Sequence, residues 1–246
     1  MKTIIITGDS WGAGEWGLDT DPPIVHGGLS DYFEQDGYNI INLSHPGKGP
    51  LTYLVELNKF LMISRNKIEH IFFIQSCIGR DFTTRFDEHL PFLKRLPGSH
   101  HLLWDNNCNL ESNIVGMYRQ VYDKLNFMAT YHRKIINVIG GYTDLPLPFI
   151  EFSNLNFLIP SWVSLIDPSI PKCMLMPIHN GIHNGVFGYL DKNCKDKQEI
   201  LSYIDAAQKR SSFMENNKEF FWPDGRHPNR KGHKVLYDAI KTKLNL

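Results

Sequence analysis

Short apolar runs alternate with longer amphipathic stretches along most of the chain. The runs are nearly continuous and rich in β-branched residues, which is typical of strands buried on both faces of a parallel sheet. Strands are predicted at residues 3–7, 38–43, 71–74, 134–139 and 155–159. Helices are predicted at residues 29–33, 51–63 and 113–131, and from Asn229, a good N-cap residue, to the C-terminus. This alternation predicts an α/β domain with helices on both faces of its sheet.

Two stretches, residues 80–111 and 167–221, do not follow this alternation. Both are rich in Pro, Gly, His and Asn, although a charged helix is predicted within the second one near residues 198–209. Long irregular segments in α/β domains often build the substrate site. No low-complexity linker separates parts of the chain, so residues 1–246 are expected to form a single domain in which these two segments flank the site.

Composition narrows the class of protein. The chain has 246 residues, 42% of them hydrophobic and 21% charged, with a formal net charge of zero. These values fit a globular protein with a sizeable core, and they favour neither a nucleic-acid nor an anionic-membrane partner. The N-terminal apolar run is too short for a signal peptide, and no later run could span a bilayer. The four cysteines form no C-x-x-C pair, so we expect reduced thiols, no metal site and a cytoplasmic location.

Three chemical motifs overlap in the segment "TIIITGDSWGAGEWG" at residues 3–17. The dinucleotide fingerprint G-x-G-x-x-G begins at Gly12, too far from the strand end for a tight turn. In addition, the second predicted strand ends without the acidic residue that would bind a ribose. The α/β-hydrolase elbow G-x-S-x-G requires earlier strands and an earlier oxyanion loop, but Ser10 follows the first strand of the chain. Both motifs are therefore disfavoured.

The third motif, Gly8-Asp9-Ser10, gains weight from the segment "WPDGRHPNRKGHKVLYDAI" near the C-terminus. Asp224 and His227 lie three residues apart there, in one loop before a predicted helix. An aspartate at this spacing can accept the Nδ1 proton of the histidine and leave Nε2 to take a proton from a serine. Each residue also has a structural explanation, since Ser10 could cap a helix and Asp224 could form a turn. The combination favours a Ser10–His227–Asp224 triad.

Together these residues resemble the SGNH, or GDSL, hydrolase superfamily. Gly8-Asp9-Ser10 matches its first block, "NLSHPG" at residues 42–47 its second, and "DGRHPNRKG" at residues 224–232 its fifth. The resemblance implies a three-layer α/β/α sandwich of the flavodoxin-like type. It also implies a carboxylic ester hydrolase with Ser10 as nucleophile, His227 as base and Asp224 as its orienting partner. The backbone N–H groups of Ser10 and Gly47 would form the oxyanion hole, and no metal or organic cofactor is implied.

The third block departs from the family. The family places Gly-x-Asn-Asp after the third strand, whereas this chain has "FFIQSCIGRD" at residues 72–81, with Gln75 in place of the Gly and Cys77 in place of the Asn. A thiol is a poor hydrogen-bond donor, so Gln75 is the expected third oxyanion donor, with the Ser76 hydroxyl as an alternative.

Two functions follow from this pattern. The first is hydrolysis of a small-molecule or glycan ester, including O-acetyl esters, through an acyl-serine. The second, suggested by the altered third block, is a catalytically weak domain of the same fold that binds a glycan or another ligand. The ester and the oligomeric state are left open.

Overall fold

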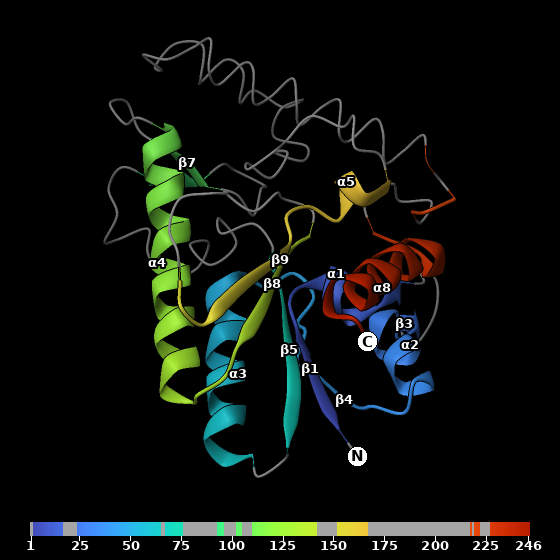
Figure 1. Cartoon of the computed structure of the whole chain (residues 1–246). Helices are drawn as coiled ribbons and strands as arrows, with labels where there is room; N and C mark the ends of the chain where they lie inside the picture. Colours follow the sequence, from blue (N-terminus) through green and yellow to red (C-terminus); the bar gives the residue numbers. More distant parts are fainter. Residues whose placement is uncertain are drawn as a thin grey trace.

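The computed structural model of the chain describes residues 2–16, 24–64, 67–75, 93–95, 102–104, 110–141, 152–166, 217, 219–221 and 227–246. Its centre is a parallel sheet with the strand order β4-β1-β5-β8-β9 (Figure 1). The strands are β1 (Thr3–Thr7), β4 (Asn39–Asn42), β5 (Ile68–Gln75), β8 (Ile136–Gly140) and β9 (Leu155–Ile159). Numbered by their succession within this sheet, they follow the order 2-1-3-4-5 of flavodoxin-like folds. The predicted fold class is confirmed.

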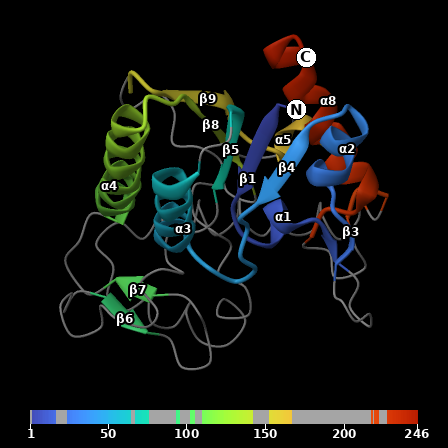
Figure 2. The ribbon, with the colours of Figure 1, turned by 90° about the horizontal axis from the view of Figure 1, so that it is seen from below.

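Helices cover both faces of the sheet (Figure 2). Helices α2 (Leu29–Gln35) and α8 (Arg230–Leu244) lie on one face, while α3 (Pro50–Ile63) and α4 (Leu110–Tyr131) lie on the other. We call these the α2/α8 face and the α3/α4 face. Helix α8 packs beside α2, so segments from both ends of the sequence share one helical layer.

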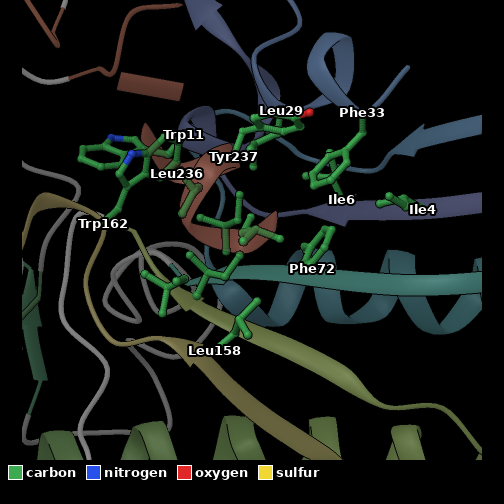
Figure 3. Close-up of a cluster of buried hydrophobic side chains, with 14 of the residues drawn as sticks. Ile4, Ile6, Trp11, Leu29, Phe33, Phe72, Leu158, Trp162, Leu236 and Tyr237 are labelled. Atoms are coloured by element: carbon green, nitrogen blue, oxygen red, sulfur yellow. The ribbon is translucent and has the colours of Figure 1, made fainter. Parts of the chain in front are cut away.

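The two faces have separate hydrophobic cores because successive side chains of each strand point to opposite sides. Ile4 and Ile6 of β1 join the core of the α2/α8 face, whereas Ile5 joins that of the α3/α4 face. All three are fully buried. Figure 3 shows the first core, in which Phe33 of α2 and Leu236 of α8 pack near Ile6 and Phe72.

Five strands and four helices therefore lie close to their predicted positions, with differences at the ends. Strand β5 begins at Ile68 and includes Gln75, so it extends beyond the predicted residues 71–74 at both ends. Helix α4 begins at Leu110, within the segment predicted to be irregular.

The structure also contains short elements that the sequence pattern did not predict. These are α1 (Ser10–Ala13), β2 (Glu15–Trp16), β3 (Ile24–His26), β6 (Leu93–Arg95), β7 (Leu102–Trp104) and α5 (Val163–Ile166). Strands β6 and β7 pair antiparallel inside the predicted irregular segment 80–111. Elements of two to four residues are too short for a periodic pattern to reveal. The helix predicted near residues 198–209 lies outside the described residues.

Within the described ranges, no helix is both long and apolar enough to cross a bilayer.

Candidate active site

Ser10 is the first residue of α1, directly after the turn that follows strand β1. The Asp9 side chain caps this helix by accepting a hydrogen bond of 3.0 Å from the Trp11 backbone N–H. Gly8 allows the start of this turn to lie close against β5, because a Cβ there would lie 2.9 Å from both the Cβ and the carbonyl oxygen of Ile74. The helix is therefore capped by Asp9, and a capping role does not explain Ser10.

His227 lies beside Ser10, although 217 positions separate them in the sequence. Its Nε2 is 2.9 Å from Ser10 Oγ. When the imidazole carries its proton on Nδ1, Nε2 is the acceptor and the serine hydroxyl is the donor. The sequence favours a Ser10–His227–Asp224 triad, and the structure places the Ser10 and His227 side chains within hydrogen-bonding distance.

Hydrogen bonds connect the end of β4 and the loop after it to the turn that carries Ser10. The His45 N–H donates to the Gly8 carbonyl at 2.8 Å. Asn42 Nδ2 donates to the Gly12 carbonyl at 2.9 Å and to Ser30 Oγ at 3.0 Å, while Asn42 Oδ1 accepts from the Ser44 N–H at 2.9 Å. This loop carries Gly47, which is exposed. The hydrogen bonds therefore hold this loop in place beside the turn that carries Ser10.

Gly12 of the overlapping motifs and Gly47 of the second block have steric explanations here. A Cβ at Gly12 would lie 2.5 Å from Ser44 Oγ, so this position allows α1 to approach the β4 loop closely. Gly47 has a φ of 75°, a left-handed conformation that glycine adopts without strain. The glycine at position 12 thus serves packing, which agrees with the rejection of a dinucleotide site.

Gln75, the expected third oxyanion donor, ends strand β5 and is 1% exposed. Its Oε1 accepts a hydrogen bond from the Tyr122 hydroxyl of α4. Its Nε2 is buried and has no hydrogen-bond partner among the residues that the structure describes. The side chain points to the α3/α4 face, because Phe73, two residues earlier, belongs to the core of that face. Its role in an oxyanion hole stays a prediction.

Three predicted residues of the site lie outside the described part of the chain, namely Asp224, Ser76 and Cys77. Across the described ranges, no group of three His, Cys, Asp or Glu side chains could hold a metal ion.

A second histidine, His233, lies in the first part of α8 and differs from His227 in environment. It is fully buried, with its ring 5.0 Å from that of Trp162 in an edge-on arrangement. Burial lowers the pKa of His233 to about 3, and the nearby Gly14 backbone only partly opposes this shift. Within the described part of the chain, neither ring nitrogen makes a hydrogen bond of standard geometry. His233 is therefore a neutral packing residue, and His227 is the candidate base.

Sequence reasoning missed two asparagines that organise this region. Asn42 links the β4 loop to the turn after β1, as described above. Asn229 was expected only as a helix cap, and its Oδ1 does accept from the Gly232 N–H at 3.1 Å. Its Nδ2 also donates to the carbonyls of Glu219 and Phe221 at 3.0 and 3.3 Å. Both asparagines lie inside the quoted blocks, but the motif pattern does not reveal their partners.

No protein-family model matches the chain, and no curated protein sequence matches it. Solved structures do show similarity to it. A lipase/acylhydrolase from Enterococcus faecalis is 17% identical, with a TM-score of 0.44 over 99% of this chain and 95% of that one. A psychrotrophic esterase from Pseudoalteromonas sp. is 14% identical, with a TM-score of 0.44 over 99% of each chain. An acetyl xylan esterase from Geobacillus stearothermophilus is 9% identical, with a TM-score of 0.40 over 99% of this chain and 94% of that one.

These structures are esterases and acylhydrolases, the class of protein that the sequence motifs predict. Similarity at this level carries no argument about activity, so the assignment of a function depends on the geometry of the site itself.

Proposed function

We propose that the protein is a serine hydrolase of the SGNH type that cleaves a carboxylic ester through an acyl-serine. The observation that carries the proposal is the 2.9 Å contact between Ser10 Oγ and His227 Nε2, at the end of the first strand of a flavodoxin-like sheet. A nucleophile within hydrogen-bond reach of a base is the minimal requirement of this chemistry.

The reaction would proceed in two halves. Ser10 Oγ attacks the ester carbonyl carbon while its proton passes to His227 Nε2. The tetrahedral intermediate then collapses, the C–O bond to the alcohol breaks, and the leaving oxygen takes the proton from Nε2. Water attacks the acyl-serine with His227 again as base, which releases the acid and regenerates Ser10. In this proposal Asp224 accepts a hydrogen bond from Nδ1–H of His227 and stabilises the imidazolium.

The oxyanion donors in the proposal are the backbone N–H groups of Ser10 and Gly47, together with Gln75 Nε2. The bond between His45 N and the Gly8 carbonyl supports the first two, because it holds the loop that carries Gly47 against the Ser10 turn. Gln75 is included because its Nε2 group is a buried donor that no described residue satisfies, which is unfavourable unless a ligand accepts from it. The substrate class is a small-molecule or glycan ester, including O-acetyl esters.

The decisive experiment is hydrolysis of p-nitrophenyl acetate by the full chain, by Ser10→Ala and by His227→Ala, with labelling of each by a fluorophosphonate probe. We expect turnover and labelling only in the unaltered protein. Wild-type turnover by folded Ser10→Ala would reject the proposal. A panel of acyl-chain lengths and acetylated sugars would then define the ester.

One observation favours the second candidate, a catalytically weak ligand-binding domain. The Gln75 carboxamide is engaged with Tyr122 on the α3/α4 face. If Gln75 stays there when a ligand binds, the oxyanion would lose one donor. Binding of acetylated sugars with equal affinity to the unaltered protein and to Ser10→Ala, without measurable turnover by either, would favour this candidate.

A further inference from the structure

Two short segments on either side of residues 222–226 are held together by a backbone bridge and by Asn229. They consist of residues 219–221 on the entering side and residues 228–229 on the leaving side, and together we call them the loop base. Phe221 and Pro228 form an isolated antiparallel bridge across it. Asn229 donates from its backbone N–H to the Phe220 carbonyl at 3.0 Å and from Nδ2 to the carbonyls of Glu219 and Phe221. Three consecutive carbonyls thus accept hydrogen bonds from this single residue.

The first turn of α8 lies close against the same segment. The Asn229 Oδ1 caps this turn, so one carboxamide binds the helix through its oxygen and the loop base through its nitrogen. A Cβ at Gly232 would lie only 2.4 Å from the Phe220 carbonyl oxygen. Backbone cannot move aside as a flexible side chain can, so Gly232 is required for this approach.

The loop base also lies against the helix that carries Ser10. Phe221 is 1% exposed, and its ring centroid lies 6.3 Å from that of Trp11, the residue after Ser10. Ser10 and His227 are therefore connected by two routes. One is their direct contact of 2.9 Å, and the other runs from Trp11 through Phe221 and across the bridge to Pro228, which follows His227.

We propose that Asn229 is a positioning residue that sets the reach of His227 to Ser10 by holding the loop base against α8. The proposal rests on the function proposed above for the Ser10–His227 pair. It goes beyond helix capping, because a cap needs only the side-chain oxygen. The two contacts of Nδ2 with carbonyl oxygens contribute nothing to the cap. They fix the position of residues 219–221, on the entering side of the loop base.

Two variants weaken the loop base by different means. Asn229→Ser keeps an acceptor for the cap, but its shorter side chain cannot bridge to the carbonyls of Glu219 and Phe221. Gly232→Ala keeps Asn229 and pushes the Phe220 carbonyl away from the helix. Tyr237→Phe is the matched control, because it removes a hydrogen bond of 2.6 Å to Asp36 from the same helix at a distance from the loop base.

We expect Asn229→Ser and Gly232→Ala to lower kcat for p-nitrophenyl acetate by about ten- to a hundredfold, because a misplacement of about 1 Å costs up to that much. KM should change by much less, and Tyr237→Phe should keep wild-type kcat despite a lower Tm. Wild-type kcat in both folded loop-base variants would overturn the proposal. An equal loss of kcat in Tyr237→Phe would overturn it as well, since that loss would reflect general loosening of α8.

A second measurement is independent of turnover. In nitrogen NMR spectra, Ser10→Ala should change the His227 ring signals, because it removes the partner of Nε2. The same substitution in an Asn229→Ser background should change them much less, as a double-mutant cycle would report. If Ser10→Ala changed the His227 ring signals as much in the Asn229→Ser background as in the otherwise unaltered protein, the positioning role of Asn229 would be rejected. If the unaltered protein lacked turnover, the proposed function would fail, and this cycle would still decide the role of Asn229.

Discussion

Each face of the sheet has an apolar core, but the polar contacts of the two faces connect different parts of the molecule. On the α2/α8 face, such contacts join segments that carry the candidate site. The Glu15 carboxylate pairs with Arg230 at 3.2 Å, and Trp162 Nε1 donates to the Gly232 carbonyl at 3.0 Å. On the α3/α4 face, the Tyr122–Gln75 contact reaches the carboxyl end of the sheet. The Ser10–His227 pair therefore adjoins the layer of α8, whereas Gln75 contacts the opposite layer.

This difference predicts that substitutions on the two faces have different effects on the geometry of the site and on the stability of the fold. Large-to-small substitutions in the core of the α2/α8 face should alter the Ser10–His227 geometry as well as the free energy of unfolding, whereas loss of a peripheral hydrogen bond such as Tyr237–Asp36 should alter stability alone. Substitutions on the α3/α4 face should alter mainly stability, unless Gln75 takes part in the reaction. Four measurements test this distinction.

The largest expected effect is that of removing either reacting partner. Ser10→Ala and His227→Ala should each lower kcat by at least about a thousandfold, and the double variant should be hardly worse, because the residues act as a unit. Initial rates with p-nitrophenyl acetate give the comparison. Additive losses in the double variant would show that the two residues act separately.

Gln75 tests whether the α3/α4 face contributes to catalysis. Gln75→Ala should lower kcat about a hundredfold or more and change KM less, because an oxyanion donor acts mainly in the transition state. Tyr122→Phe is its control, since it removes the hydroxyl that binds Oε1 and leaves Nε2 in place. Equal kcat for Gln75→Ala and the unaltered protein, both folded, would assign Gln75 to the core alone.

A pair of core leucines compares the faces directly. Leu57 of α3 and Leu236 of α8 are both fully buried, one in each core. Replacing either with alanine should cost about 2–5 kcal/mol in the free energy of unfolding, measured by urea denaturation. At a temperature where both variants remain folded, Leu236→Ala should also lower kcat, whereas Leu57→Ala should not. The reverse pattern would contradict the distinction between the faces.

The smallest effect concerns acid stability through His233 on the α2/α8 face. Burial lowers its pKa from 6.5 to about 3, so between these values the unfolded chain binds a proton that the folded chain does not. Stability should therefore be unaffected by this group above pH 6.5 and should fall below it, by at most about 1.4 kcal/mol per pH unit. Urea denaturation at pH 7 and at pH 5 should show a smaller decrease for His233→Leu than for the unaltered protein. Equal decreases would contradict the assignment.

The sequence predicted the layers well because continuous apolar runs and amphipathic stretches carry the sheet and its helices. It also indicated the Ser10–His227 pair, since the motifs at both ends of the chain specify loops at the same edge of the sheet. The orientation of Gln75 was missed because the predicted strand ended at residue 74. Once β5 includes Gln75, the alternation of side chains directs it to the α3/α4 face. The partners of Asn229 were not predictable, because they are backbone carbonyls, which have no signature in the sequence.

The separation of 217 positions between Ser10 and His227 has a consequence for biosynthesis. Strands β1, β4 and β5 can pair as soon as Gln75 has been synthesised, long before His227 exists. Closing so long a loop is entropically costly and slow relative to local pairing. Under the proposed function, the nascent chain can therefore bury its first strands without hydrolysing esters. Recovery of turnover during refolding would report the docking of α8 as a late event, after the sheet has formed.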